Sequence, residues 1–158
     1  MIFKKLREAM DQLPTMTING KDYKPRFEVG TKEQLTAFLS VTRKAGERIY
    51  PLIWLETQME EGSVVELNFV LATINSRTDM GNWDRLDLTF GTTLEPLLDN
   101  LIIALKQSGI LSTTGEWDRY YRGTRYFNYH VTPDIWDAIG FTVEMNYKAE
   151  CKVKTIYF

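Results

Sequence analysis

The chain has 158 residues, of which 44% are hydrophobic, 13% aromatic and 25% charged, with a formal net charge of −2. This length suits one domain over residues 1–158, and the ordinary apolar content argues against intrinsic disorder. The single cysteine, Cys151, excludes an intrachain disulfide. No signal-peptide pattern is visible at the start, and no apolar run approaches the ~20 residues of a membrane span. We therefore expect a soluble protein.

The first 30 residues predict a helix followed by an extended arm. Apolar residues recur at helical spacing through residues 1–13, and Pro14 ends the pattern. Asn19-Gly20 is a strong tight-turn signal, so we expect a small hairpin across it.

A second helix is predicted to begin after Thr31, which forms a capping-box pattern with Gln34. The helix would run to about Ala45, and Gly46 is a suitable stop. Its predicted buried stripe consists of Leu35, Phe38, Leu39 and Thr42.

Two strands follow, with an acidic turn between them. Residues 49–57 are bulky and apolar, and Pro51 favours a strand start or an edge position. Residues 64–74 alternate between apolar and mostly polar side chains, so one face is expected in the core. These two strands are predicted to pair as an antiparallel hairpin.

Residues 75–89 are interpreted as a polar loop, followed by a helix that begins at a capping box of Thr92 and Glu95. Gly109 suits the end of that helix. Its leucine-rich stripe has helical spacing and comprises Leu94, Leu97, Leu98, Leu101, Ile102 and Leu105.

The last part of the chain predicts another strand pair, at residues 124–131 and 138–147, with residues 110–123 as a connection. In the first strand, Tyr126 and Tyr129 are expected on opposite faces. We predict an α+β fold with an antiparallel-dominated β-sheet of two hairpins and helices packed on one face. We expect residues 1–30 to form an N-terminal helix and an extended arm, residues 31–148 the core sheet and helices, and residues 149–158 a C-terminal extension.

Candidate catalytic and metal-binding residues form no recognisable motif. His130 is the lone histidine, and Cys151 could meet it across strands, but no nucleophile motif surrounds either residue. Phosphate-binding glycine loops are absent from the sequence. We therefore predict a non-enzyme without cofactor or metal. Two acidic groups that lack regular cation-ligand spacing are Glu56, Glu60 and Glu61, and Asp79, Asp84 and Asp87.

Residues 117–127 interleave arginines with aromatic residues. Three interpretations stay open for this segment. It could be a protein–protein interface, a strand whose rings pack on the sheet, or a single-stranded nucleic-acid site. The sequence pI of about 5.5 argues against nucleic acid as the main partner.

The order of these elements resembles the tail-completion and tail-terminator family, the minor tail or neck proteins of tailed bacteriophages. The resemblance covers about residues 31–148, and its local motif is the aromatic-proline strand opening at Tyr50-Pro51. An apolar strand, a long loop, a leucine-rich helix and a closing strand pair follow.

The resemblance implies a structural virion protein in the tail or neck, assembled in the host cytoplasm. It implies a ring of identical copies, a hexamer or alternatively a dodecamer, that contacts other neck or tail proteins and no membrane. Nucleic acid would be met only as DNA passing through the ring. The residues expected at contacts are Asp79, Trp83, Asp84, Trp117, Arg119, Tyr120, Tyr121, Arg122 and Arg125, with Tyr157 and Phe158 of the C-terminal extension.

Overall fold

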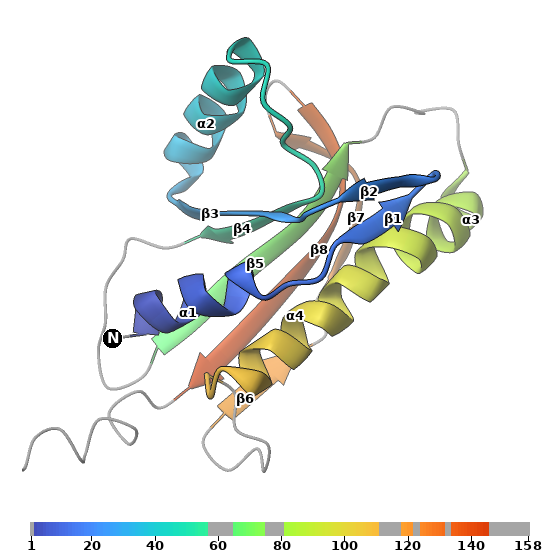
Figure 1. Ribbon diagram of the computed structural model, residues 1–158. Coiled ribbons are helices and arrows are strands. Elements are labelled where there is room, and N and C mark those ends of the chain that lie inside the picture. The colour runs from blue at the N-terminus through green and yellow to red at the C-terminus, as the bar shows by residue number, and fades with distance from the viewer. Residues whose placement is uncertain are drawn as a thin grey trace, which may run out of the picture.

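The structure is a computed structural model. It describes residues 2–56, 65–74, 81–110, 118–121, 124–131 and 134–145. The α+β class predicted from the sequence is confirmed, with helices on a large central sheet (Figure 1).

The larger sheet has six strands in the order β3-β4-β5-β8-β6, and β7 pairs with another part of β8. Their bounds are β3 (Arg26–Gly30), β4 (Leu52–Glu56), β5 (Val65–Ile74), β6 (Asp118–Tyr121), β7 (Arg125–Val131) and β8 (Asp134–Met145). This sheet is mixed rather than antiparallel-dominated, because β3 runs parallel to β4. The reason is the helical crossover between these two strands, which returns the chain to its starting end.

The two predicted strand pairs are confirmed. β4 and β5 pair antiparallel with Trp54 opposite Val70, and β7 pairs antiparallel with β8. β8 begins at Asp134, four residues before its predicted start. β6 is a short strand inside the stretch interpreted as a connection.

Helices cover both faces of the sheet, so the expectation of helices on one face is wrong (Figure 1). The helices α1 (Ile2–Asp11) and α4 (Glu95–Gln107) contribute to the core on one face, while α2 (Lys32–Lys44) packs on the other. The central strands require this arrangement, because their side chains are apolar on both faces. In β4, Ile53 lies in the first core, whereas Trp54 lies in the core beneath α2.

The longest helical segment begins earlier than the sequence predicted. α3 (Asn82–Arg85), the π-helix η1 (Leu86–Leu94) and α4 run on without a break through 26 residues. Residues 82–89 are therefore helical rather than a loop. The predicted capping box is also wrong, because the Thr92 hydroxyl donates to the Leu88 carbonyl inside the helix.

The leucine-rich stripe of α4 is confirmed as buried. By length and composition, the segment Asn82–Gln107 would also be apolar enough to cross a membrane. Here its apolar stripe faces the sheet, and core helices commonly pass the same test.

The predicted N-terminal helix and the small hairpin are confirmed. α1 spans Ile2–Asp11, and β1 (Met16–Ile18) and β2 (Lys21–Tyr23) form a separate two-stranded hairpin. Its turn places Asn19 and Gly20 at φ of 52° and 78°, the left-handed region that these residue types tolerate. The capping box of α2 is present in both directions between Thr31 and Gln34.

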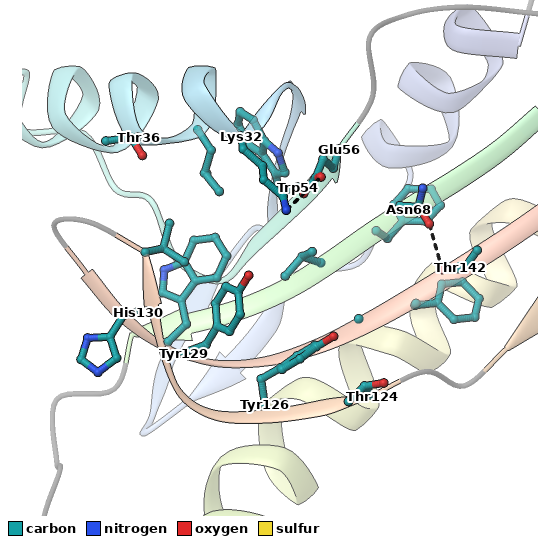
Figure 2. A pocket seen from close by; sticks show the side chains of 17 residues that line it. Lys32, Thr36, Trp54, Glu56, Asn68, Thr124, Tyr126, Tyr129, His130 and Thr142 are labelled. Atoms are coloured by element: carbon teal, nitrogen blue, oxygen red, sulfur yellow. Dashed lines mark hydrogen bonds and ion pairs between the residues drawn. The ribbon is translucent and has the colours of Figure 1, made fainter.

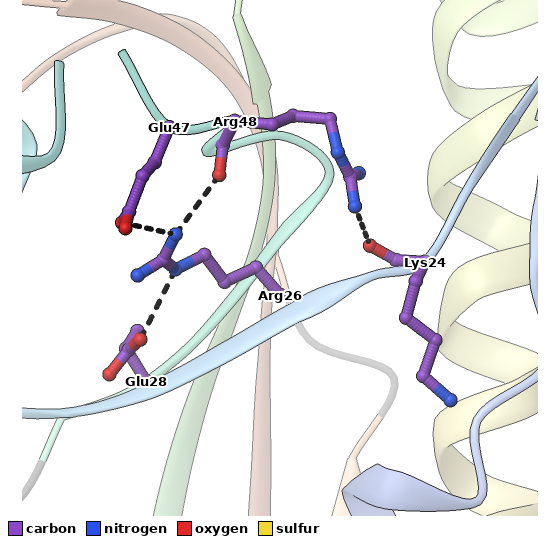
Figure 3. Close-up of polar contacts among 5 residues, drawn as sticks. All are labelled: Lys24, Arg26, Glu28, Glu47 and Arg48. Atoms are coloured by element: carbon purple, nitrogen blue, oxygen red, sulfur yellow. Dashed lines mark hydrogen bonds and ion pairs between the residues drawn. The ribbon is translucent and has the colours of Figure 1, made fainter. Parts of the chain in front are cut away.

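Polar contacts attach the edge strand β3 to the segment before β4 (Figure 3). The Arg26 guanidinium lies 3.2 Å from the Glu28 carboxylate and 3.3 Å from that of Glu47, and it donates to the Arg48 carbonyl. Arg48 in turn donates to the Lys24 carbonyl at 2.7 Å. These contacts join the start of β3 to the segment that leads from α2 into β4.

Candidate functional site

A groove of about 540 Å³ lies on the α2 face of the sheet, between α2 and β7 (Figure 2). Such a volume is typical of binding pockets. The floor comes from β5 and β8, because α2 packs mainly over the β4 side of the sheet. We call this hollow the aromatic groove, and its walls include Lys32, Trp54, Glu56, Tyr126, Tyr129 and Trp136.

The tyrosine wall of the groove depends on a β-bulge. Tyr126 is opposite Ala138 and Tyr129 is opposite Trp136, so β7 carries one extra residue between these pairs. The bulge places both tyrosines on the α2 face, which corrects the predicted alternation. Their ring centroids are 5.1 Å apart, and each side chain remains about 40% exposed, at 38% for Tyr126 and 42% for Tyr129.

Gly140 of β8 provides the space in which the Tyr126 ring lies. A Cβ atom at this position would be 3.2 Å from the Tyr126 ring. The Gly140 amide also donates to the Thr124 carbonyl at 2.8 Å, at the start of β7. A glycine inside a strand often marks such a close approach, so Gly140 helps to shape the groove.

Polar groups lie on the floor and at one end of the groove (Figure 2). Thr142 donates to the Asn68 side chain at 3.0 Å, and the Lys32 ammonium is 4.0 Å from the Glu56 carboxylate. The indole Nε1 of Trp54 is buried and has no hydrogen-bond acceptor among the described residues. A buried donor without a partner is costly, so this wall of the groove lacks an acceptor.

A partly buried hydrogen-bond network holds Trp136 in place behind the groove. Trp136 Nε1 donates to the Tyr50 hydroxyl at 2.6 Å, and that hydroxyl donates to the Asp134 carboxylate. Arg43 of α2 completes the network with an ion pair of 2.6 Å to Asp134. Burial, followed by the hydrogen bond to Asp134, raises the pKa of Tyr50 well above its usual range. The phenol therefore stays neutral and rigidly positions Trp136.

Two of the predicted contact residues lie on α3, on the other side of the molecule. Trp83 is 81% exposed and Asp84 is exposed, while the neighbouring Arg85 is fully buried. Arg85 forms an ion pair of 3.1 Å with Asp137 of β8, and both side chains are at most 3% exposed. This buried pair attaches the start of the helical segment to the sheet and so fixes the position of Trp83.

Arg125, another predicted contact residue, forms an ion pair with Glu95 of α4. Its guanidinium therefore already has an intramolecular partner. Of the remaining predicted contacts, Arg119, Tyr120 and Tyr121 lie on β6, where the structure describes the backbone. Those outside the described residues are Asp79, Trp117, Arg122, Tyr157 and Phe158.

Two of the candidate chemical groups, His130 and Glu56, line the aromatic groove, and the other described ones lie elsewhere. His130 is exposed at the end of β7, and Cys151 lies outside the described residues. Glu56 lines the groove, Asp84 and Asp87 are exposed on the helical segment, and Glu60 and Glu61 fall in an undescribed range. Within the described ranges, His, Cys, Asp and Glu form no group of three or more that could hold a metal ion.

Comparison with known proteins gives no family assignment. No protein-family model matches the sequence, and no curated protein matches it. The geometry of the groove and of the exposed surface is therefore the basis for a functional interpretation.

Sequence reasoning missed the groove because its walls come from distant parts of the chain. Lys32 and Tyr126 are separated by more than half of the sequence, and the bulge that turns Tyr129 toward α2 has no strong local signal. Gly140, inside an otherwise apolar strand, was the available indication of a close approach.

Proposed function

We propose that the protein is a structural virion component of a tailed bacteriophage that forms a ring at the head–tail junction or at the tail end. The order of elements carries this proposal. A strand that follows Tyr50-Pro51 pairs with a longer apolar strand, a leucine-rich helix comes next, and a strand pair closes the sheet. This order is the one that the tail-completion and tail-terminator resemblance implies for residues 31–148.

Exposed apolar side chains support an assembling protein. Trp83, Leu88 and Ile103 are at least half exposed along the outer side of the helical segment, at 81%, 57% and 51%. Tyr126 and Tyr129 are partly exposed on the opposite face of the sheet. Large exposed aromatic residues are typical of protein interfaces. Two separate surfaces of this kind suit head-to-tail contacts, which form a ring when the rotation between copies closes.

The test is the mass of the native particle, measured by native mass spectrometry over a concentration series. Negative-stain electron microscopy then shows the shape of the particle. A closed ring, six copies first and twelve as the alternative, is the expected result. A protein that stays monomeric at high concentration and also fails to assemble with tail-tube or connector proteins would contradict the proposal.

A second candidate function is a binding module for single-stranded nucleic acid. The observation that favours it is the pair of partly exposed rings of Tyr126 and Tyr129, because bases stack on such surfaces. The ion pair of Arg125 with Glu95 weakens this alternative, since it occupies the cation nearest to the rings in sequence. Salt-dependent quenching of tyrosine and tryptophan fluorescence by an oligonucleotide is the expected signature.

A further inference from the structure

We propose that the exposed α3 surface of one copy docks into the aromatic groove of the next copy. This inference rests on the proposed ring-forming function and identifies the contact that would build the ring. We call the docking surface the Trp83 knob and define it as Trp83, Asp84 and Leu88.

The knob is an exposed surface built on a fixed support. Trp83 is 81% exposed and Leu88 is 57% exposed. They lie five residues apart on one continuous helical segment, Trp83 in α3 and Leu88 in the π-helix that begins at Leu86. The buried pair of Arg85 and Asp137 anchors the turn that carries Trp83. Little backbone freedom would therefore be lost when the indole is buried in a contact.

The groove has the size and the side chains to accept an indole ring. Its volume of about 540 Å³ exceeds what one tryptophan side chain requires, and aromatic rings line it on two sides. Tyr126 and Tyr129 leave part of their rings uncovered, and aromatic pairs gain stabilisation beyond the area that they bury. Leu88, the second apolar residue of the knob, suits the same lining.

Charge at the rim supports the same occupant. Lys32 is 73% exposed, and among the described residues its ammonium pairs with one carboxylate, that of Glu56, at 4.0 Å. Its ammonium can therefore form an ion pair with a second carboxylate. Asp84, which adjoins Trp83 on the knob, would supply that carboxylate from the next copy. Complementary charge at the edge of a contact sets orientation and speeds association.

Knob and groove lie on opposite faces of the sheet, so a chain cannot fill its own groove. The residues Leu86, Phe90 and Leu94 of η1 pack on the core that α1 and α4 share, whereas the groove opens on the α2 side. Contacts between unlike surfaces on opposite sides propagate from copy to copy and close when the rotation allows. A ring is the closed form of this geometry.

The experiment uses two variants of the full chain that each remove one side of the contact. Trp83→Ala removes the knob, and Thr36→Trp fills the groove from the exposed face of α2 without removing a core side chain. Each variant alone is expected to weaken self-association by about 30-fold or more, as for a central aromatic anchor. Val41→Ala is the matched control, because it removes an exposed apolar side chain from α2 that belongs to neither the knob nor the groove.

The decisive measurement is an equimolar mixture of the two variants. The Trp83→Ala copy keeps its groove and the Thr36→Trp copy keeps its knob, so the mixture should form a one-to-one dimer and nothing larger. Native mass spectrometry separates this dimer from rings and from monomers. Urea unfolding of each variant verifies that both chains remain folded.

Other outcomes overturn the inference and separate it from the proposed function. Rings that persist in both variants would refute the knob-in-groove contact and leave the ring proposal standing. A monomeric wild-type protein would refute the contact, and the virion role would then depend on assembly with tail-tube or connector proteins. Oligonucleotide quenching that Thr36→Trp abolishes, with assembly unchanged, would assign the groove to nucleic acid instead.

Discussion

The buried ion pair between Arg85 and Asp137 gives the sharpest test of how the helical segment is held. Both side chains are at most 3% exposed, and their charged atoms are 3.1 Å apart. Removing one partner of such a pair leaves the other charge buried without full compensation, which typically costs about 3–5 kcal/mol. We therefore expect Arg85→Met to lower the free energy of unfolding by about 3–5 kcal/mol, a large part of an ordinary domain's stability.

The assay is urea unfolding at neutral pH, followed by tryptophan fluorescence and circular dichroism. The double variant Arg85→Met with Asp137→Leu should recover much of the loss, because replacing a whole buried pair with apolar groups is often nearly neutral. Glu56→Gln is the control, since its partner Lys32 is 73% exposed and such a surface pair contributes about 0–1 kcal/mol. An Arg85→Met loss no greater than that of Glu56→Gln would refute the reasoning.

Three further predictions test the core, the Tyr50 network and the α2 cap. Leu101→Ala should cost about 2–5 kcal/mol in urea unfolding, because Leu101 is fully buried, whereas Ile103→Ala on the outer side should cost far less. The stabilisation that Tyr50 provides relative to Tyr50→Phe should be constant below pH 10 and should decrease above it. The unfolded phenol loses its proton near pH 10, while burial and the hydrogen bond to Asp134 raise the pKa of the folded one; a difference that stays constant from pH 9 to pH 11 would contradict this account. Thr31→Ala should cost about 0.5–2 kcal/mol, since its hydroxyl accepts from the Gln34 amide at the start of α2, and an unchanged thermal midpoint would argue against the cap.

The predictions that succeeded depend on short-range patterns. The capping box of Thr31, the turn at Asn19-Gly20 and the leucine spacing of α4 each involve residues a few positions apart. Local backbone geometry alone sets which side chains meet at these separations. The same holds for the alternation in β5, which indicated its pairing with β4.

The loop predicted at residues 82–89 was wrong, because contacts with distant residues decide the secondary structure there. Glycines flank this stretch and polar residues occupy it, so a loop was the natural interpretation. The structure stabilises it as helix through distant partners. Arg85 pairs with Asp137, and Phe90 packs against Phe127 of β7 with ring centroids 5.2 Å apart. Tertiary contacts of this kind routinely override weak helix propensity.

By itself, the sequence determined the α+β class, the positions of most helices and strands, and the antiparallel partners that are close in the chain. Only the tertiary structure decided that β3 joins the sheet in parallel, that α2 covers the opposite face, and that a bulge turns Tyr126 and Tyr129 toward it. The physical reason is the range of the interactions. Periodicity encodes which side of an element is apolar, whereas the face on which an element packs depends on the free energy of the whole sheet. The aromatic groove belongs to this second kind of information, because it exists only where distant segments meet. The knob is local in sequence, but the helix that carries it is anchored by the distant residue Asp137.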